Sequence, residues 1–325
     1  MWSNVIHDRD EKLVSWKAFR KRYYKHNPVL FEMLKTLRGR ETAFLGASSH
    51  GASPVRCVKA HQVGYLESNF KSYNFYNRPY NVYISLAKLN NMPLFSFAPK
   101  IRRGQQDVFN IEFKKYMYDY DLAFDFEAKC SMKFGNIEDA NELAGSLREN
   151  DIPFEFTPSK RGFHVTIPET RKNDIFKLCR SQVERLKNSL DDYNVPYVLK
   201  WSGGGYHIRI MGNYLPKVTK WEERLEYCKM FALNVKQVFN LTTLDITIYD
   251  MRRVFKAPYS IDIKSDLVAL PLDNDNFNFL SSYSDMEKFC DPRVILMRTD
   301  IRNRGLLERK GTKENLTKYF DEIIK

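Results

Sequence analysis

We predict an α+β fold for this 325-residue chain from three observations. Segments with the two-residue alternation of strands, such as residues 121–129, are interleaved with segments of helical periodicity, such as residues 138–150. Hydrophobic residues form 43% of the chain, which is enough for a packed core. No linker rich in Pro, Gly or Ser divides the chain, so we expect helices and mixed sheets layered within one unit.

The elements are expected in a simple order along the chain. Residues 1–40 form a basic helical segment, residues 41–275 form the core, and residues 276–325 form a helical tail. Small polar residues predict a loop at 44–56, and residues 91–115 look irregular. The remaining elements are strands at 80–89, 121–129 and 244–250, helices at 138–150, 171–190, 221–239 and within 283–325, and hairpins at 154–168 and 197–210.

Charge and composition narrow the class of protein. Lys and Arg number 52 against 40 Asp and Glu, and this net charge of +12 suggests a polyanionic partner such as nucleic acid. No apolar run approaches the ~20 residues of a membrane span, and the start lacks a signal peptide. We therefore expect a cytoplasmic protein with no membrane partner. Five scattered cysteines without a C-x-x-C motif indicate reduced thiols and no zinc site.

Two carboxylates stand two residues apart in the predicted strand DLAFDFEAK. Asp125 and Glu127 leave the same face, whereas Phe124 and Phe126 point the other way. Paired carboxylates repel each other unless a cation lies between them, and hard oxygen ligands are what Mg²⁺ prefers. The simpler alternative is an edge strand with a solvated acidic face.

A third carboxylate, Asp245, lies in LTTLDITIYD and precedes a basic segment. Arg253, Lys256 and Lys264 crowd this segment, and such side chains can grip a triphosphate through charge-assisted hydrogen bonds. An ordinary solvated basic loop is the alternative.

The pattern Ser-x-x-Gly-aromatic-His followed by a strand occurs twice, as SKRGFHVTI at 159–167 and SGGGYHIRI at 202–210. Glycines let the backbone approach phosphate oxygens, and the serine hydroxyl and the histidine add donors. The alternative is a glycine hairpin with a surface histidine. The short distance from Glu127 favours the first copy and the Ser-Gly start favours the second, so both stay open.

Taken in order, DLAFDFE, a Ser-x-x-Gly-aromatic-His strand and LDITIYDMRRVFKAPYSIDIKSDLVALPL resemble the archaeo-eukaryotic primase superfamily. The likeness is greatest to the small catalytic subunit of replicative primases, and it covers residues 40–275 if RETAF, Arg56 and YNVYISLA are included. It implies a primase fold, in which an α/β unit packs on an RNA-recognition-like mixed sheet with added helices.

The resemblance also implies roles for particular residues. Asp125, Glu127 and Asp245 match the acids that bind two Mg²⁺ or Mn²⁺ ions and are catalytic. The residues matched to nucleotide or phosphate binding are Ser159, Lys160, Arg161 and His164, or Ser202, Gly203, Gly204 and His207, together with Lys256, Arg253 and Arg56.

The chain departs from the family pattern at several positions. Glu127 stands where replicative primases usually have Asp, as in plasmid and viral branches. Asp262 stands where the family usually has His. The interval 128–201 holds only Cys130 and Cys179, so we expect no zinc knob.

The function expected from this resemblance is a template-directed nucleotidyltransferase, acting as a primase, a polymerase or both in an archaeal, plasmid or viral setting. Its partners would be single-stranded DNA template, NTPs or dNTPs and an RNA or DNA primer. Preference for ribose or deoxyribose stays open, as does the need for a partner like the primase large subunit. One alternative is a non-catalytic subunit that binds single strands. The other is a metal-dependent nuclease, which would want an H-x-H pair that the chain lacks.

Overall fold

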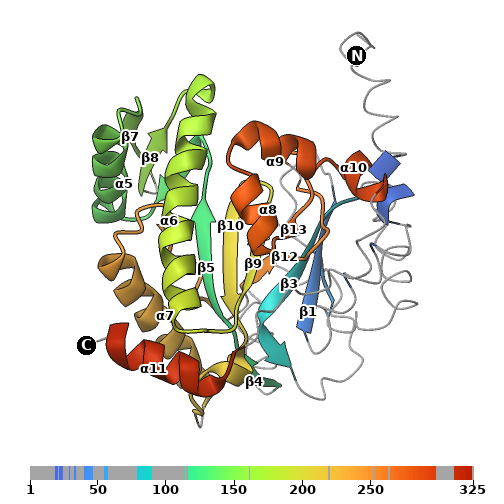
Figure 1. The fold of residues 1–325 in the computed structure, drawn as a ribbon, viewed down its shortest axis with the longest axis vertical. Coiled ribbons are helices and arrows are strands. Elements are labelled where there is room, and N and C mark those ends of the chain that lie inside the picture. The colour runs from blue at the N-terminus through green and yellow to red at the C-terminus, as the bar shows by residue number, and fades with distance from the viewer. Residues whose placement is uncertain are drawn as a thin grey trace.

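The computed structural model describes most of the chain from residue 116 onward and parts of the chain before it (Figure 1). The predicted basic helix at 1–40 and the irregular stretch at 91–115 fall largely outside the described residues. The described residues are 19–20, 22–24, 29, 33, 40–46, 55–57, 79–89, 114, 116–160, 162–218, 220–251, 253–262, 264–297 and 311–323.

A five-stranded sheet forms the centre of the molecule, in the order β11-β5-β10-β9-β13. Its four leading strands are joined as β5–α6–β9–β10–α7–β11, which is the β-α-β-β-α-β connectivity of ferredoxin-like sheets. The bounds are β5 Leu122–Glu127, α6 Lys172–Asp192, β9 Val198–Trp201, β10 Gly205–Ile210, α7 Trp221–Val238, β11 Leu244–Asp245 and β13 Leu270–Pro271.

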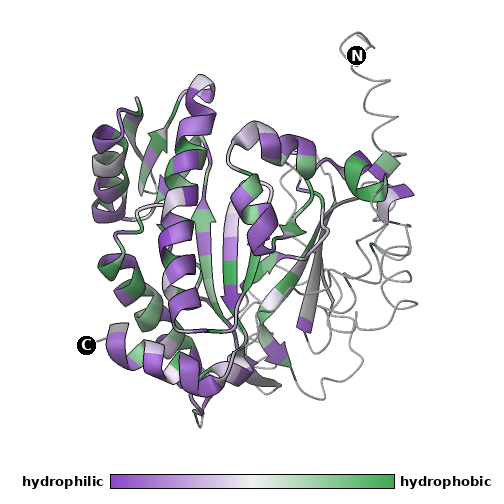
Figure 2. Ribbon diagram, viewed as in Figure 1, coloured by the Kyte–Doolittle hydropathy of each residue, from purple (hydrophilic) through white to green (hydrophobic). Residues whose placement is uncertain are grey.

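Helices α6 and α7 cover one face of this sheet, and Figure 1 shows α6 lying across its strands. Phe124 packs against Phe231 of α7, and Tyr206 packs against Phe176 of α6. Figure 2 shows the matching pattern, in which α6 is largely hydrophilic on its outer side and the strands beneath carry hydrophobic residues. The opposite face of the sheet is therefore the one left for polar side chains.

A second sheet lies beside the first and contains β12-β3-β1-β2, with β4 paired to β3. Its bounds are β1 Arg40–Gly46, β2 Val55–Cys57, β3 Pro79–Leu89, β4 Met117–Tyr120 and β12 Val254–Lys256. Since β1 extends to Gly46 and β2 begins at Val55, the loop predicted at 44–56 is wrong at both ends.

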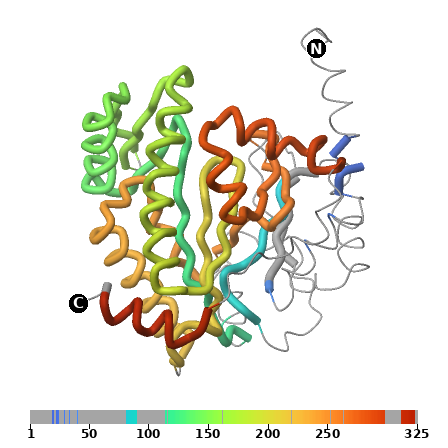
Figure 3. Tube along the Cα trace, in the orientation of Figure 1, coloured from blue at the N-terminus to red at the C-terminus, as the bar shows by residue number. Residues whose placement is uncertain are grey.

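A separate lobe is inserted between β5 and α6, and Figure 3 shows it set off at the upper left. It has its own small hydrophobic core, built around Met132, Leu143 and Val165. We call residues 131–167 the insert. It contains β6 Ser131–Phe134, α5 Ile137–Glu149, β7 Glu155–Ser159 and β8 Gly162–Thr166, with strand order β6-β8-β7, and η2 Glu169–Arg171 leads from it to α6.

The remaining helices lie in the C-terminal part of the chain, as predicted for the tail. Among the described residues, no helix is both long and apolar enough to cross a membrane. The bounds are η3 Gly212–Tyr214, α8 Asn274–Phe279, α9 Tyr283–Phe289, α10 Pro292–Met297 and α11 Lys313–Ile323.

The α+β class and most predicted elements are confirmed, but two expectations are wrong. All strand pairs between the described residues are antiparallel, so the sheets are not mixed. The helical crossover from β5 reaches β9, which is not a neighbour of β5 because β10 lies between them. The strand expected at 244–250 ends at Asp245, whose carboxylate accepts hydrogen bonds from the Thr247 amide and hydroxyl, a local turn that competes with a ladder.

Candidate active site

The acid pair lies on an interior strand of the central sheet, because β5 is flanked by β11 and β10. Phe124 and Phe126 are fully buried on the helix-covered face, as the alternation predicted. Asp125 and Glu127 lie on the other face with 22% of each side chain exposed. The alternative of a solvated acidic edge is wrong, since β5 is not an edge and Asp121 is fully buried.

Four polar side chains form one row across four strands. Asp125 lies opposite Asp245 of β11 on one side and opposite His207 of β10 on the other, and His207 lies opposite Lys200 of β9. Residues directly opposite in an antiparallel pair share a face. The register therefore brings together an acid, a second acid, an imidazole and an ammonium from segments spread over 120 residues of the chain.

His207 is the immediate neighbour of Asp125, with its Nε2 atom 3.2 Å from Oδ1. Burial lowers the pKa of His207 to about 4 despite the carboxylate, so the imidazole is neutral at neutral pH and donates Nε2–H to Asp125. Burial alone would raise the pKa of Asp125, but His207 lowers it to about 2. Nδ1 of His207 is buried without a hydrogen-bond partner among the described residues, and the ring stacks 4.3 Å from that of Phe255.

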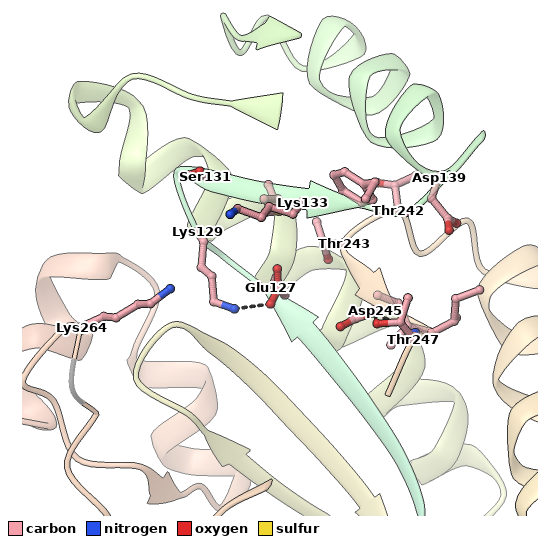
Figure 4. A pocket seen from close by; sticks show the side chains of 15 residues that line it. Glu127, Lys129, Ser131, Lys133, Asp139, Thr242, Thr243, Asp245, Thr247 and Lys264 are labelled. Carbon is pink, nitrogen blue, oxygen red and sulfur yellow. Dashed lines mark hydrogen bonds and ion pairs between the residues drawn. The ribbon is translucent and has the colours of Figure 1, made fainter. Parts of the chain in front are cut away.

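Glu127 has a cation of its own, because the Lys129 ammonium pairs with its carboxylate (Figure 4). Burial raises the pKa of Glu127, and the charge of Asp125 raises it further against the opposing effect of Lys129. The pKa of Lys129 rises in turn, because Glu127 and Asp125 outweigh burial. The acid pair is thus partly neutralised from within the chain.

The second serine–glycine hairpin forms the turn beside the acid pair. The Ser202 hydroxyl donates to the Gly205 carbonyl at 3.0 Å, and Gly203 has a φ of 93°, which favours glycine. A Cβ atom on Gly205 would overlap the Phe126 carbonyl oxygen, so this glycine is what lets β10 approach β5. Gly204 lies against the side chain of Lys129.

The basic segment supplies Lys256, which joins this hairpin to a neighbouring loop. Its Nζ donates to the Ser202 carbonyl at 2.8 Å and pairs with Asp262 at 2.5 Å. Burial lowers the pKa of Lys256, against the effect of Asp262. Asp262 also accepts from the Ser265 amide at 3.0 Å, so the acid that replaces the family's histidine shapes the loop and holds a lysine.

The first serine–glycine hairpin lies in the insert, away from this row. His164 lies opposite Lys133 and Thr157 rather than an acid. The Ser159 hydroxyl donates to the Gly162 carbonyl at 3.2 Å, in an exposed turn. Lys160 is exposed at the tip, and Arg161 lies outside the described residues. The register therefore points to the second copy, where spacing had pointed to the first.

Two further predicted residues have different surroundings. Arg253 donates from Nε to the Ile248 carbonyl at 3.0 Å and from Nη2 to the Thr247 carbonyl at 2.8 Å, so its guanidinium braces the turn after Asp245. Arg56 is in β2, but its side chain lies outside the described residues.

Two cavities adjoin the acids and share Glu127, Lys129 and Asp245 in their walls. The larger, of about 570 Å³, lies between the two sheets. The smaller, of about 310 Å³, lies toward the insert. Cationic side chains line the larger cavity around the acids: Lys129, Lys172, Arg253, Lys256 and Lys264.

The three acids offer the hard oxygen donors that Mg²⁺ and Mn²⁺ take. In the described part of the chain, however, no group of three or more His, Cys, Asp or Glu is arranged to hold a metal ion. Glu127 is paired with Lys129, and Asp245 is turned to Thr247. The donor chemistry thus fits an ion held by one or two carboxylates plus substrate phosphates, and not an all-protein cage.

Sequence reasoning missed Lys129 and Lys200. Lys129 continues the alternation of Asp125 and Glu127 by one more step, and that period could have identified it. Lys200 is buried, and its Nζ donates to the Lys256 carbonyl. Burial and the charges of Arg209 and Lys256 hold its pKa well below the usual range. Its place in the row follows only from the register of the hairpin.

Comparison with known proteins adds little. Neither a family model nor a curated protein sequence matches the chain. Among solved structures, the chain is similar to the polymerase domain of Mycobacterium tuberculosis ligase D in complex with DNA, with a TM-score of 0.33 and 13% sequence identity over 90% of each chain. A likeness of this strength carries no argument about activity.

Proposed function

We propose that the chain is a template-directed nucleotidyltransferase of the primase-polymerase kind, which makes or extends RNA or DNA primers on single-stranded DNA with NTPs or dNTPs. The observation that carries this proposal is the row across the central sheet, which brings the predicted third acid and one predicted histidine to either side of Asp125. The β-α-β-β-α-β connectivity of the sheet agrees with the RNA-recognition-like sheet that the sequence motifs imply.

In this proposal Asp125, Glu127 and Asp245 would hold Mg²⁺ or Mn²⁺ together with substrate phosphates. Bound there, the metal would supply positive charge at the reacting phosphate and fix its orientation. His207 orients the Asp125 carboxylate through the contact of 3.2 Å. Lys256, beside the turn of the second hairpin, would attract the triphosphate within the larger cavity. Zinc has no part in this proposal.

The experiment that tests the proposal is primer synthesis and extension on bare single-stranded template, with NTPs or dNTPs and with Mg²⁺ or Mn²⁺. The double variant Asp125→Ala/Glu127→Ala should lose incorporation while keeping its fold by circular dichroism. The matched control is Glu222→Ala/Glu226→Ala, which removes two exposed carboxylates from α7 and should leave the rate unchanged. Undiminished incorporation by the first variant would exclude the assignment.

A second candidate is a non-catalytic subunit that binds single strands and keeps the fold. The observation in its favour is that Lys129 already neutralises Glu127 and that the described acids form no metal cluster. The same assay separates the two candidates. A wild-type chain that binds single-stranded DNA but incorporates no nucleotide with either metal would favour the binding subunit.

A further inference from the structure

The smaller cavity connects the acid pair to the insert. Figure 4 shows Ser131 and Lys133 from β6 on one side and Lys264 from the loop after β12 on another, with Glu127 between them. Asp245 and Thr247 lie across from these lysines. The cavity thus has an acidic side at the candidate metal site and a cationic side toward the insert.

The cationic side is available to a ligand. Lys133 and Lys264 are exposed, and neither ammonium pairs with a carboxylate among the residues that the structure describes. Asp139 also lines the cavity, but it already pairs with Lys236 and accepts from Asn136 at 2.8 Å. Two lysine charges therefore remain beside the acid pair without an internal partner.

The cavity continues onto the open face of the sheet in the insert. Met132 and Val165 point into the small core, so the alternate residues face outward. These form two rows, in which Lys133 lies opposite His164 and His164 opposite Thr157, and Ser131 lies opposite Thr166 and Thr166 opposite Glu155. We call this surface the insert face; its members are Ser131, Lys133, Glu155, Thr157, His164 and Thr166.

We propose that the insert face, together with Lys264, binds the phosphates of a single-stranded DNA segment next to the acid pair. The inference rests on the proposed function, because it names where the strand lies relative to that site. Single-strand affinity comes chiefly from lysine and arginine contacts to phosphate, and the free lysines with the net charge of +12 complement such a strand.

The surface suits a strand better than a free nucleotide. Lys256 and His207, which the motifs link to the triphosphate, line the larger cavity but not the smaller one. The insert face also extends over three strands, which lie about 4.8 Å apart, and so offers hydroxyl and imidazole donors well beyond the cavity. A nucleotide would leave most of this surface uncovered.

The test is the binding of a fluorescent oligo-dT to the full chain by anisotropy, with EDTA and without nucleotide, over a range of salt concentrations. Each lost lysine–phosphate contact should lower the slope of log K against log salt by about 0.7, which is about 5-fold in affinity at 0.1 M salt. The variant Lys133→Ala/Lys264→Ala should therefore bind about 25-fold more weakly. The matched control, Lys177→Ala/Lys229→Ala, removes two exposed lysines from α6 and α7 and should also lose charge, but without a change of slope.

Two outcomes would overturn the inference. One is an unchanged slope and affinity in Lys133→Ala/Lys264→Ala. The other is displacement of oligo-dT from this surface by excess dNTP in wild type but not in the variant, which would make it a nucleotide subsite. Because the assay needs neither metal nor turnover, its failure is separate from failure of the proposed function. Weak binding by the lysine variant would support the surface even if wild type incorporated nothing.

Discussion

The two hairpins that carry the repeated Ser-x-x-Gly-aromatic-His pattern have the same local structure and different neighbours. In each, the serine hydroxyl donates to the carbonyl of the glycine three residues on. In each, that glycine lies where a Cβ atom would overlap a carbonyl of the adjacent strand. The histidine then faces Lys133 and Thr157 in the insert, but Asp125 and Lys200 in the central sheet.

This difference separates what the pattern encodes from what the fold adds. Ser, Gly and the aromatic residue build a tight turn and a closely packed returning strand, which needs no ligand. The chemistry of the histidine comes from the strand beside it, because register decides which side chains it meets. A repeated motif therefore predicts a repeated hairpin, and only one of the two hairpins lies beside the acids.

The largest expected effect concerns the residue two positions after each histidine. Arg209 is buried and lies 3.7 Å from Asp121, which also pairs with Arg40 at 2.5 Å, whereas the equivalent Thr166 is exposed. Asp121→Asn leaves buried cations unpaired and should lower the free energy of unfolding by about 3–5 kcal/mol, measured by urea titration at pH 7. The control Glu222→Gln on α7 should change it by less than about 0.5 kcal/mol.

The pH dependence gives this prediction a sign. Burial would raise the pKa of Asp121, but Arg40, Arg209 and Lys88 hold it below its ordinary value. A lowered carboxyl pKa stabilises the fold above the unfolded value of about 3.9, and the stabilisation is lost as the pH falls through the folded value. The gap between wild type and Asp121→Asn should thus persist from pH 7 to about pH 4 and narrow below it. A gap that narrows between pH 7 and pH 5 would contradict this account.

The histidines give the second prediction. His207→Ala removes the donor that orients Asp125 and should lower the rate of nucleotide incorporation about 10²-fold, a typical cost of a misplaced catalytic group. His164→Ala should change the rate by less than about 3-fold in the same assay, because no acid lies opposite it. His207→Gln keeps a donor and should recover part of the loss. A larger loss from His164→Ala would reverse the assignment of the two hairpins.

The sequence predicted the elements and the acid pair well because both depend on local periodicity. Alternation along 121–129 was sufficient to put Asp125 opposite in direction to Phe124. It was insufficient to choose a hairpin, because the 131–167 insert separates β5 from its true neighbour β10 and brings the wrong copy closer along the chain. Asp121 looked like part of a solvated face, since its cations come from Arg40 and Arg209, each about 80 residues away.

The glycines give a smaller effect that differs in where it is felt. Ala at Gly205 would push against the Phe126 carbonyl and should lower the free energy of global unfolding by about 1–3 kcal/mol. Ala at Gly162 would push against the Phe134 carbonyl, but only within the insert. Hydrogen exchange should therefore show lost protection confined to β6 and β8 for Gly162→Ala, and loss across the central sheet for Gly205→Ala. Equal loss across both sheets in the two variants would mean that the insert does not unfold separately.

The serines give the smallest effect and test whether the turn has a second use. Ser202→Ala removes a buried hydroxyl donor and should cost about 1 kcal/mol of unfolding free energy, whereas the exposed Ser159→Ala should cost less than about 0.5 kcal/mol. If Ser202 serves only its own turn, the KM for nucleotide should be the same in Ser202→Ala as in wild type. A rise in KM without a matching loss of stability would mean that the hydroxyl leaves the Gly205 carbonyl to meet a phosphate. The same measurement on Ser159→Ala should show neither change, since its hairpin lies outside the row of acids.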